Sequence, residues 1–386
     1  MSDAARVPLA QVRDLLVPGE PLPFRVLDAQ GRLLLAAGQR IVGTDQLQAL
    51  LERGASVESE QAMAVRRARE AGAAGGAVPS HRRATWFDAW ERQLWALDKL
   101  LRTLGRDPAQ CQALEDFADA QLRLVDKHPD AALFLAIRQD DRRFTLYALT
   151  HALHTATIAV GCARLLCWPA PRQRTLALAA LTMNASILEL QAQMAEQTDP
   201  PTKRQMDAIR AHPQRSAELL RASGVTDAEW LTAVEDHHER AGGSGYPRGL
   251  ATVGEMAHVL RAADVFAAKV SPRLLREPLL PQVAARQLFQ EEAGGAVAGA
   301  LIKAVGVYPP GEFVQLRNGE TAVVVQRASA GQAPRVVVLL TPAGKPAPDA
   351  PQRDTADPAC AIAGVATQRS GLPRVLPEQV FGLLEP

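Results

Sequence analysis

Hydrophobic side chains recur at three- and four-residue steps through the middle of the chain. The first stripe begins at Trp86 and continues through Trp90, Leu94 and Leu101. This spacing places apolar side chains on one face of an α-helix, and helices of this kind bury that face against one another. Further helices are predicted at residues 110–127, 130–138, 146–167, 172–192, 202–222, 226–238, 254–270 and 281–304. We therefore expect residues 86–307 to form one helical domain.

The N-terminal residues 1–64 follow a different pattern, with short apolar runs separated by turns. Two such runs within residues 22–35 flank a turn that ends in glycine, which is typical of a β-hairpin. Thr44 is expected to cap a helix that ends at Gly54, and a last strand is predicted around Val57. This part predicts a small α/β module.

The C-terminal residues 308–386 return to strand-like patterns. The dipeptide Asn318-Gly319 joins two apolar runs, and it is the favoured two-residue turn of a β-hairpin. A third strand is predicted at residues 335–340, whereas residues 343–358 are rich in proline and aspartate and predict a loose segment. The fold class expected for the whole chain is mainly α, with an α/β module before the bundle and a β-rich module after it.

Residues 65–85 are rich in alanine, glycine and arginine and have no apolar period, so they predict a linker. The local arginine clusters lie in this segment. Over the whole chain 43 lysines and arginines balance 42 acidic residues, which leaves a formal net charge of +1. No general basic field is therefore available to attract nucleic acid.

The composition is that of an ordinary globular protein, with 47% apolar and 22% charged residues. The four cysteines form no Cys-x-x-Cys pair, which argues against a disulfide framework and a thiolate zinc site. The N-terminus has no signal-peptide pattern. The most apolar window, residues 152–169, contains His154 and Arg164 and is too short and polar to cross a bilayer. We expect a cytoplasmic protein without a membrane span.

The chemistry-bearing feature of the chain is a histidine pair followed by a glycine-rich turn. His237 and His238 precede Glu239, and the turn closes with Tyr246-Pro247. Histidine is rare here, with eight in 386 residues, so an adjacent pair beside a carboxylate is informative. This motif resembles the HD-GYP family of metal-dependent phosphodiesterases, which open the bacterial second messenger cyclic di-GMP. The resemblance covers about residues 145–276 and implies an HD-type helical bundle.

The resemblance also assigns roles to individual residues. The residues that match the family's metal ligands are His151, His212, His237, His238 and Asp264. Arg273 lies where the family has an arginine that would meet a phosphate. The residues of the turn that could contact a nucleotide or a partner protein are Gly243, Gly245, Tyr246 and Pro247.

The chain departs from the family at the His-Asp motif that gives the family its name. Met183 stands in place of the histidine, Asn184 in place of the bridging aspartate, and Ile187 in place of a following lysine. A thioether is a poor ligand for iron or manganese, and an amide lacks the anionic charge that offsets repulsion between two metal ions. A binuclear site is therefore not expected. One divalent transition metal (iron, manganese or zinc) could still bind, and the alternative is a set of core histidines without metal.

Three functions follow as hypotheses. The first is a degenerate HD-GYP protein of cyclic di-GMP signalling, catalytically impaired, which acts by binding nucleotide or signalling protein partners. The second is an active cyclic di-GMP phosphodiesterase with a reduced metal site, in which Asp264 is essential. The third is a metal-free scaffold. The cluster of Trp86, Trp90 and Trp95 belongs either to the core or to a homodimer interface.

Smaller features also leave alternatives open. His154, three residues after His151, could be a further ligand or a packed core residue. Glu239 could orient a histidine or form an ion pair with Arg240. Asp140-Asp141 could replace the lost bridging carboxylate or belong to a solvated loop.

Overall fold

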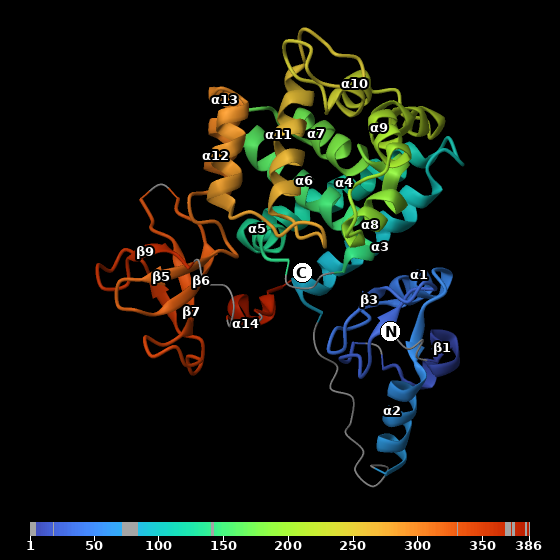
Figure 1. Cartoon of the computed structure of the whole chain (residues 1–386), viewed down its shortest axis with the longest axis vertical. Helices are drawn as coiled ribbons and strands as arrows, with labels where there is room; N and C mark the ends of the chain where they lie inside the picture. Colours follow the sequence, from blue (N-terminus) through green and yellow to red (C-terminus); the bar gives the residue numbers. More distant parts are fainter. Residues whose placement is uncertain are drawn as a thin grey trace.

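The computed structural model consists of a helical bundle with a sheet-containing module on either side of it along the chain (Figure 1). It describes residues 5–17, 19–71, 84–139, 143–329, 331–366, 372, 375–382 and 384–385. The predicted fold class, mainly α with small sheets at both ends, is confirmed. Most of the predicted linker and the Asp140-Asp141 pair lie outside the described residues.

The N-terminal module contains a four-stranded sheet in the order β1-β4-β2-β3. Its elements are β1 (Arg6–Pro8), the 3-10 helix η1 (Leu9–Leu15), β2 (Val26–Leu27), β3 (Leu33–Leu35), α1 (Thr44–Glu52), β4 (Ser56–Glu58) and α2 (Ser59–Ala71). The hairpin, the helix and the strand at Val57 are as predicted. Thr44 is not the cap of α1, because Gly43 occupies that position without a side-chain hydrogen bond. Helix α2 extends into the first part of the predicted linker.

The bundle is built around α6, which is buried along most of its length and packs against α7, α11 and α13. Its elements are α3 (Trp86–Thr103), α4 (Gln110–Lys127), α5 (Pro129–Ile137), η2 (Phe144–Leu146), α6 (Tyr147–Leu165), α7 (Ala170–Thr182), η3 (Ala185–Ile187), α8 (Leu188–Glu196), α9 (Lys203–Ala222), α10 (Ala228–Asp236), α11 (Glu255–Val270), α12 (Pro281–Glu291) and α13 (Gly295–Val305). Trp86, Trp90 and Trp95 are all buried in the main core, so this cluster is not an exposed dimer interface.

Two segments predicted as single helices are interrupted. The segment predicted at residues 281–304 breaks because Ala293, Gly294 and Gly295 have positive φ angles, which end α12 and begin α13. The segment predicted at residues 172–192 breaks into α7, η3 and α8. This second break falls at Met183-Asn184, the position of the altered family motif.

The C-terminal module is a five-stranded antiparallel sheet in the order β8-β7-β6-β5-β9. Its elements are β5 (Phe313–Leu316), β6 (Thr321–Gln326), β7 (Arg335–Leu340), β8 (Gln352–Asp354), β9 (Ile362–Val365) and α14 (Pro377–Phe381). The hairpin and the third strand are as predicted. The segment predicted to be loose contains β8, which pairs with the edge of β7.

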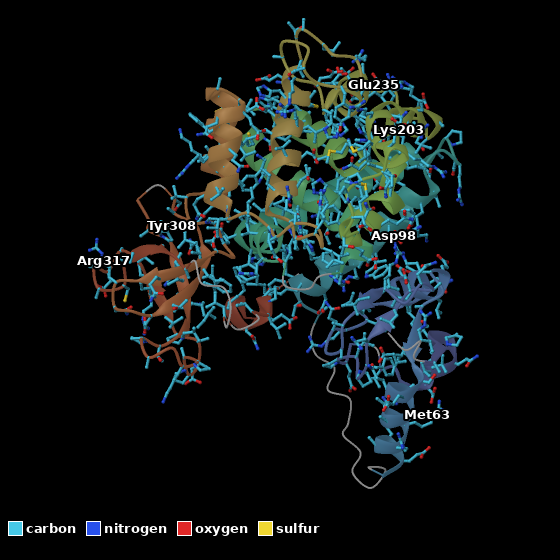
Figure 2. All side chains as sticks on the ribbon, viewed as in Figure 1. Met63, Asp98, Lys203, Glu235, Tyr308 and Arg317 are labelled. Atoms are coloured by element: carbon cyan, nitrogen blue, oxygen red, sulfur yellow. The ribbon has the colours of Figure 1, made fainter. Side chains whose placement is uncertain are left out.

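The modules contact the bundle through specific side chains. Asp98 lies on the side of the bundle that faces the N-terminal module (Figure 2). Its carboxylate forms an ion pair with the guanidinium of Arg53, 2.5 Å away. Helix α14 packs on α5, where Phe381 meets Phe134 edge to face at 5.2 Å. The hydrophobic core of the N-terminal module is continuous with that of the bundle.

One stretch, Ala170–Glu196, is long and apolar enough to cross a membrane by length and composition. Its most apolar window is 67% buried inside the bundle, where α7 packs against α6 and α10. Core helices of water-soluble proteins pass the same test of length and composition, so this stretch fits a core helix of the bundle.

Candidate metal centre

Three of the predicted ligands converge where α9 passes the end of α10. His212 lies within α9, His237 directly follows the last residue of α10, and His238 comes next. One ring nitrogen from each lies within 4.8 Å of one from each of the others. In the part of the chain that the structure describes, this is the one set of three or more potential ligands that meets this limit.

The local sequence explains how the first two rings are oriented. Pro213 has no N–H, so it cannot make the helical hydrogen bond to the carbonyl of Ile209, four residues earlier. Nδ1 of His212 donates to that free carbonyl at 2.5 Å. Nδ1 of His237 donates to the carbonyl of Val234 at 2.6 Å, at the end of α10, where helical carbonyls lack partners.

These hydrogen bonds leave both Nε2 atoms unprotonated and facing each other. Nε2 of His212 lies 3.1 Å from Nε2 of His237. Two lone pairs at this distance repel unless a cation or a shared proton lies between them. Neutral imidazoles whose second nitrogen is held by a carbonyl are the usual form of histidine metal ligands. The donor set therefore fits one divalent metal ion.

Burial keeps these rings neutral. Burial, together with the neighbouring His237, lowers the pKa of His212 to about 3. Burial also lowers the pKa of His237, and it lowers the pKa of His238 well below the usual histidine range. At neutral pH all three can act as metal ligands without first losing a proton.

The other two predicted ligands form a directly bonded pair beside this triad. Nε2 of His151, in α6, lies 2.7 Å from Oδ1 of Asp264, in α11. Burial would raise the pKa of Asp264, but the hydrogen bond from His151 holds it well below its usual value. An ionised carboxylate thus adjoins the neutral triad.

The position of the family's His-Asp motif remains beside the triad. Met183 is fully buried in the main hydrophobic core, and Asn184 precedes the short helix η3. The hydroxyl of Ser186 donates to the main-chain carbonyl of His212 at 3.1 Å. The backbone here supports α9, but its side chains provide no imidazole and no carboxylate.

Glu239 organises the loop that follows the histidine pair. Its buried carboxylate accepts hydrogen bonds from the main-chain N–H groups of Arg248, Gly249 and Leu250, at 2.5, 3.0 and 3.0 Å. It is therefore neither the partner of a histidine nor the counter-ion of Arg240, the two roles suggested by the sequence. The sequence could not have indicated this role, because the bonds join residues nine to eleven positions apart.

Comparisons with known proteins bear on the family and the fold of the chain. Residues 110–295 match the model of the family described as HD domain. A curated relative, cyclic di-GMP phosphodiesterase PA4108 of Pseudomonas aeruginosa, is 29% identical over 254 residues. That match covers 63% of this chain and 60% of the relative, so it spans about three fifths of the relative's length.

A solved structure shares the fold. Bd1817, described as an HDG"Y"P protein from Bdellovibrio bacteriovorus, superposes with a TM-score of 0.50 at 14% identity, covering 78% of this chain and 98% of the other. The resemblance to the HD-GYP family that the histidine pair and the Gly-Tyr-Pro turn indicate is thereby confirmed.

The Gly-Tyr-Pro turn of the HD domain packs on the triad. The ring of Tyr246 stacks on His238 with centroids 4.6 Å apart, and the Tyr246-Pro247 peptide bond is cis. A side chain at Gly245 would overlap the main-chain nitrogen of Arg240, so only glycine fits there. The N–H groups of Gly243 and Tyr246 bond to carbonyls of the same loop, so they do not point at a ligand.

A residue that sequence reasoning missed links Arg273 to the HD domain's centre. The guanidinium of Arg273 donates to the hydroxyl of Tyr147 at 2.6 and 3.0 Å. The ring of Tyr147 in turn stacks on His151, with centroids 5.6 Å apart and planes 7° from parallel. The sequence did contain a signal for this contact, because Tyr147 lies one helical turn before His151 on the same predicted helix.

His154 is not part of the triad. Its ring stacks on Trp90 at 6.3 Å, and its Nδ1 has no hydrogen-bond partner among the described residues. Burial, with a smaller contribution from His151, lowers its pKa to about 3. These contacts favour the interpretation of His154 as a packed, neutral core residue over its interpretation as a further metal ligand.

Proposed function

We propose that the HD domain binds cyclic di-GMP at a centre that holds one divalent metal ion, and that hydrolysis is impaired. The observation that carries this proposal is the facing Nε2 atoms of His212 and His237, 3.1 Å apart, beside the ionised Asp264. The proposed ligands are His212, His237, His238 and Asp264, with His151 bound to Asp264.

The nucleotide is inferred from the relative. The protein PA4108 is named a cyclic di-GMP phosphodiesterase, and it shares 29% identity over 254 residues. A cation at this centre would offer positive charge to a phosphate oxygen and lower the pKa of a water molecule. Arg273, held by Tyr147, is the proposed phosphate contact from the protein itself.

Impaired hydrolysis follows from the side chains at residues 183 and 184. Met183 is buried in the apolar core, and Asn184 has no negative charge to bridge two cations. A two-metal centre stabilises both the attacking and the leaving oxygen, and that geometry depends on a shared anionic ligand. A single cation at the triad would stabilise only one of these two oxygens.

The test measures binding and turnover separately. Full-length protein, purified without oxygen and supplied with iron or manganese, is incubated with cyclic di-GMP, and the products are separated by chromatography. We expect saturable nucleotide binding and intact nucleotide after long incubation. Metal-dependent product that disappears in Asp264→Ala would overturn the impairment and establish the second function, a working phosphodiesterase. If the protein binds neither metal nor nucleotide, the third hypothesis, a metal-free scaffold, replaces this proposal.

A gain-of-function pair strengthens this test. Met183→His combined with Asn184→Asp rebuilds the family's motif beside His212 and should add a second metal equivalent per chain. Met183→Leu with Asn184→Ser is the matched control, which changes the same two positions without adding ligands. A cytoplasmic location, signalling protein partners and a homodimer also remain predictions.

A further inference from the structure

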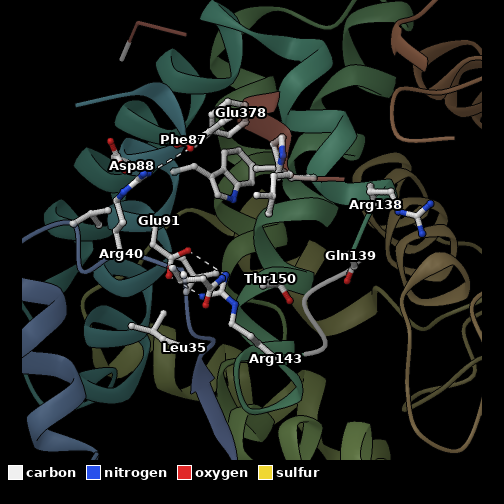
Figure 3. A pocket seen from close by; sticks show the side chains of 18 of the residues that line it. Leu35, Arg40, Phe87, Asp88, Glu91, Arg138, Gln139, Arg143, Thr150 and Glu378 are labelled. Carbon is white, nitrogen blue, oxygen red and sulfur yellow. Dashed lines mark hydrogen bonds and ion pairs between the residues drawn. The ribbon is translucent and has the colours of Figure 1, made fainter. Parts of the chain in front are cut away.

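A cavity of about 390 Å³ lies between the bundle and both accessory modules (Figure 3). Its walls come from the loop at residues 35–42 of the N-terminal module, from α3, α5 and α6, and from residues 375–378 at the start of α14. A volume of this size is in the range of small-molecule sites. The triad of histidines does not line it.

The charged groups of the cavity are already paired across it. Arg40 of the N-terminal module binds Glu378 of α14 at 3.3 Å. Arg143 binds both carboxylate oxygens of Glu91, at 2.7 and 3.1 Å. A charged ligand would have to break one of these pairs and leave a partly buried charge without its partner.

The two remaining charged residues of the lining are engaged as well. The carboxylate of Asp88 accepts the main-chain N–H of Thr85 at 2.7 Å, as part of the capping box of α3. The guanidinium of Arg138 lies over the ring of Phe313, 4.3 Å from its centroid. The fixed charges therefore favour an uncharged occupant.

The rest of the lining is suited to a flat ring system. Phe87, Trp90, Phe144 and Tyr147 lie in the lining, and of these the rings of Phe87 and Phe144 are only partly buried. Among them lies His154, 4% exposed, whose imidazole burial keeps neutral. Apolar walls with one or a few polar groups that fix orientation are typical of small-molecule sites.

We propose that this cavity binds an uncharged, planar aromatic molecule that carries one hydrogen-bonding group. Contacts with the partly exposed rings of Phe87 and Phe144 hold its rings, and the imidazole of His154 meets its polar group. The cavity adjoins the metal centre, because Tyr147 lines the cavity on one side and stacks on His151 on the other. This site is separate from the proposed nucleotide site and does not depend on it.

The experiment uses N-phenyl-1-naphthylamine, an uncharged aromatic amine that fluoresces strongly in apolar surroundings. Full-length protein is titrated with this probe, and the enhancement of emission is followed. We expect saturable binding of one molecule per chain, with a Kd on the order of 10 µM.

Two variants place the binding in the cavity. Thr150→Phe fills it from α6, and Ala37→Trp fills it from the N-terminal module, so the two substitutions act from different parts of the fold. We expect each to raise the Kd more than about 10-fold. Thr157→Phe is the matched control, since Thr157 lies on the same helix and bonds its hydroxyl to a helical carbonyl as Thr150 does, outside the cavity.

Thermal melting identifies a cavity-filling variant that fails to fold. In that case the Kd of the other cavity-filling variant tests the proposal. Absence of saturable binding in the unmodified protein overturns the proposal. Unchanged binding in a folded Thr150→Phe or Ala37→Trp protein overturns it too, because the probe then binds elsewhere.

Discussion

His212 and His237 direct their Nε2 atoms at each other across 3.1 Å, while each Nδ1 is held by a carbonyl of its own helix. Pro213 makes this possible in α9, because its missing N–H frees the carbonyl that His212 binds. Both rings are therefore oriented by the backbone before any ligand arrives, and such preorganisation lowers the cost of binding a cation.

Replacing His237 with glutamine should abolish this metal site. We expect metal affinity to fall by more than about 100-fold, since even replacing a residue that only holds a ligand in place costs about 10- to 100-fold. Metal content after dialysis against zinc or manganese measures the effect. His258→Gln is the control, because His258 binds Glu292 away from the triad and should leave the metal content unchanged.

The free energy of unfolding should fall in mild acid, because His154 takes up a proton more readily in the unfolded chain than in the folded one. Its pKa is about 3 in the folded state against about 6.5 when unfolded, so between these values the unfolded chain binds the extra proton. The stabilising contribution is complete above pH 6.5 and is lost as the pH falls toward 3. At pH 5 the loss is on the order of 1–2 kcal/mol.

His154→Phe retains a ring against Trp90 but cannot take up a proton. Urea unfolding of this variant at pH 7.5 and pH 5 should show a smaller loss of stability than the unmodified protein shows. Thr157→Val, on the same helix and without a titrating group, should lose as much as the unmodified protein. An equal loss in all three would contradict the assignment to His154.

Glu239→Gln should loosen the loop after the histidine pair. The amide keeps one acceptor but turns an N–H₂ group toward main-chain donors, which costs about 2 kcal/mol for a buried group. Hydrogen exchange at residues 248–250 should accelerate. Glu229→Gln, which alters a surface ion pair with Arg172, should leave exchange in that loop unchanged.

Gly245→Ala should destabilise the HD domain by about 2 kcal/mol, because the new methyl group overlaps the backbone of residues 239–240. The comparison is Gly254→Ala, where an added Cβ meets nothing within 4 Å and the φ angle is −61°. Melting curves of the two variants test this directly. Similar melting temperatures would mean that the loop can shift to accept a side chain.

Local signals predicted the elements whose boundaries depend on neighbouring residues. Asn318-Gly319 indicated a hairpin that the structure contains, and residues 110–127 were predicted with the bounds of α4. The candidate ligands were named from the resemblance that the His-His-Glu motif indicates, and the structure brings His212, His237 and His238 together. The break at Met183-Asn184 was missed because apolar spacing continues across it.

The sequence could not reveal features that depend on distant contacts. Glu239 binds the far side of its own loop, and β8 forms only because β7 offers an edge to pair with. The cavity requires three parts of the chain to meet, and no local pattern encodes such a meeting. Tyr147 acquires its role only when α6 packs against the segment that carries Arg273.

The ion pair between Arg40 and Glu378 joins positions 338 residues apart. The wall of the cavity that α14 contributes is therefore synthesised only after all helices of the bundle, including those that carry the histidine triad. A nascent chain or a proteolytic fragment that stops before residue 375 carries every residue of the metal centre but lacks that wall. Completion of the cavity thus requires translation to have passed residue 378.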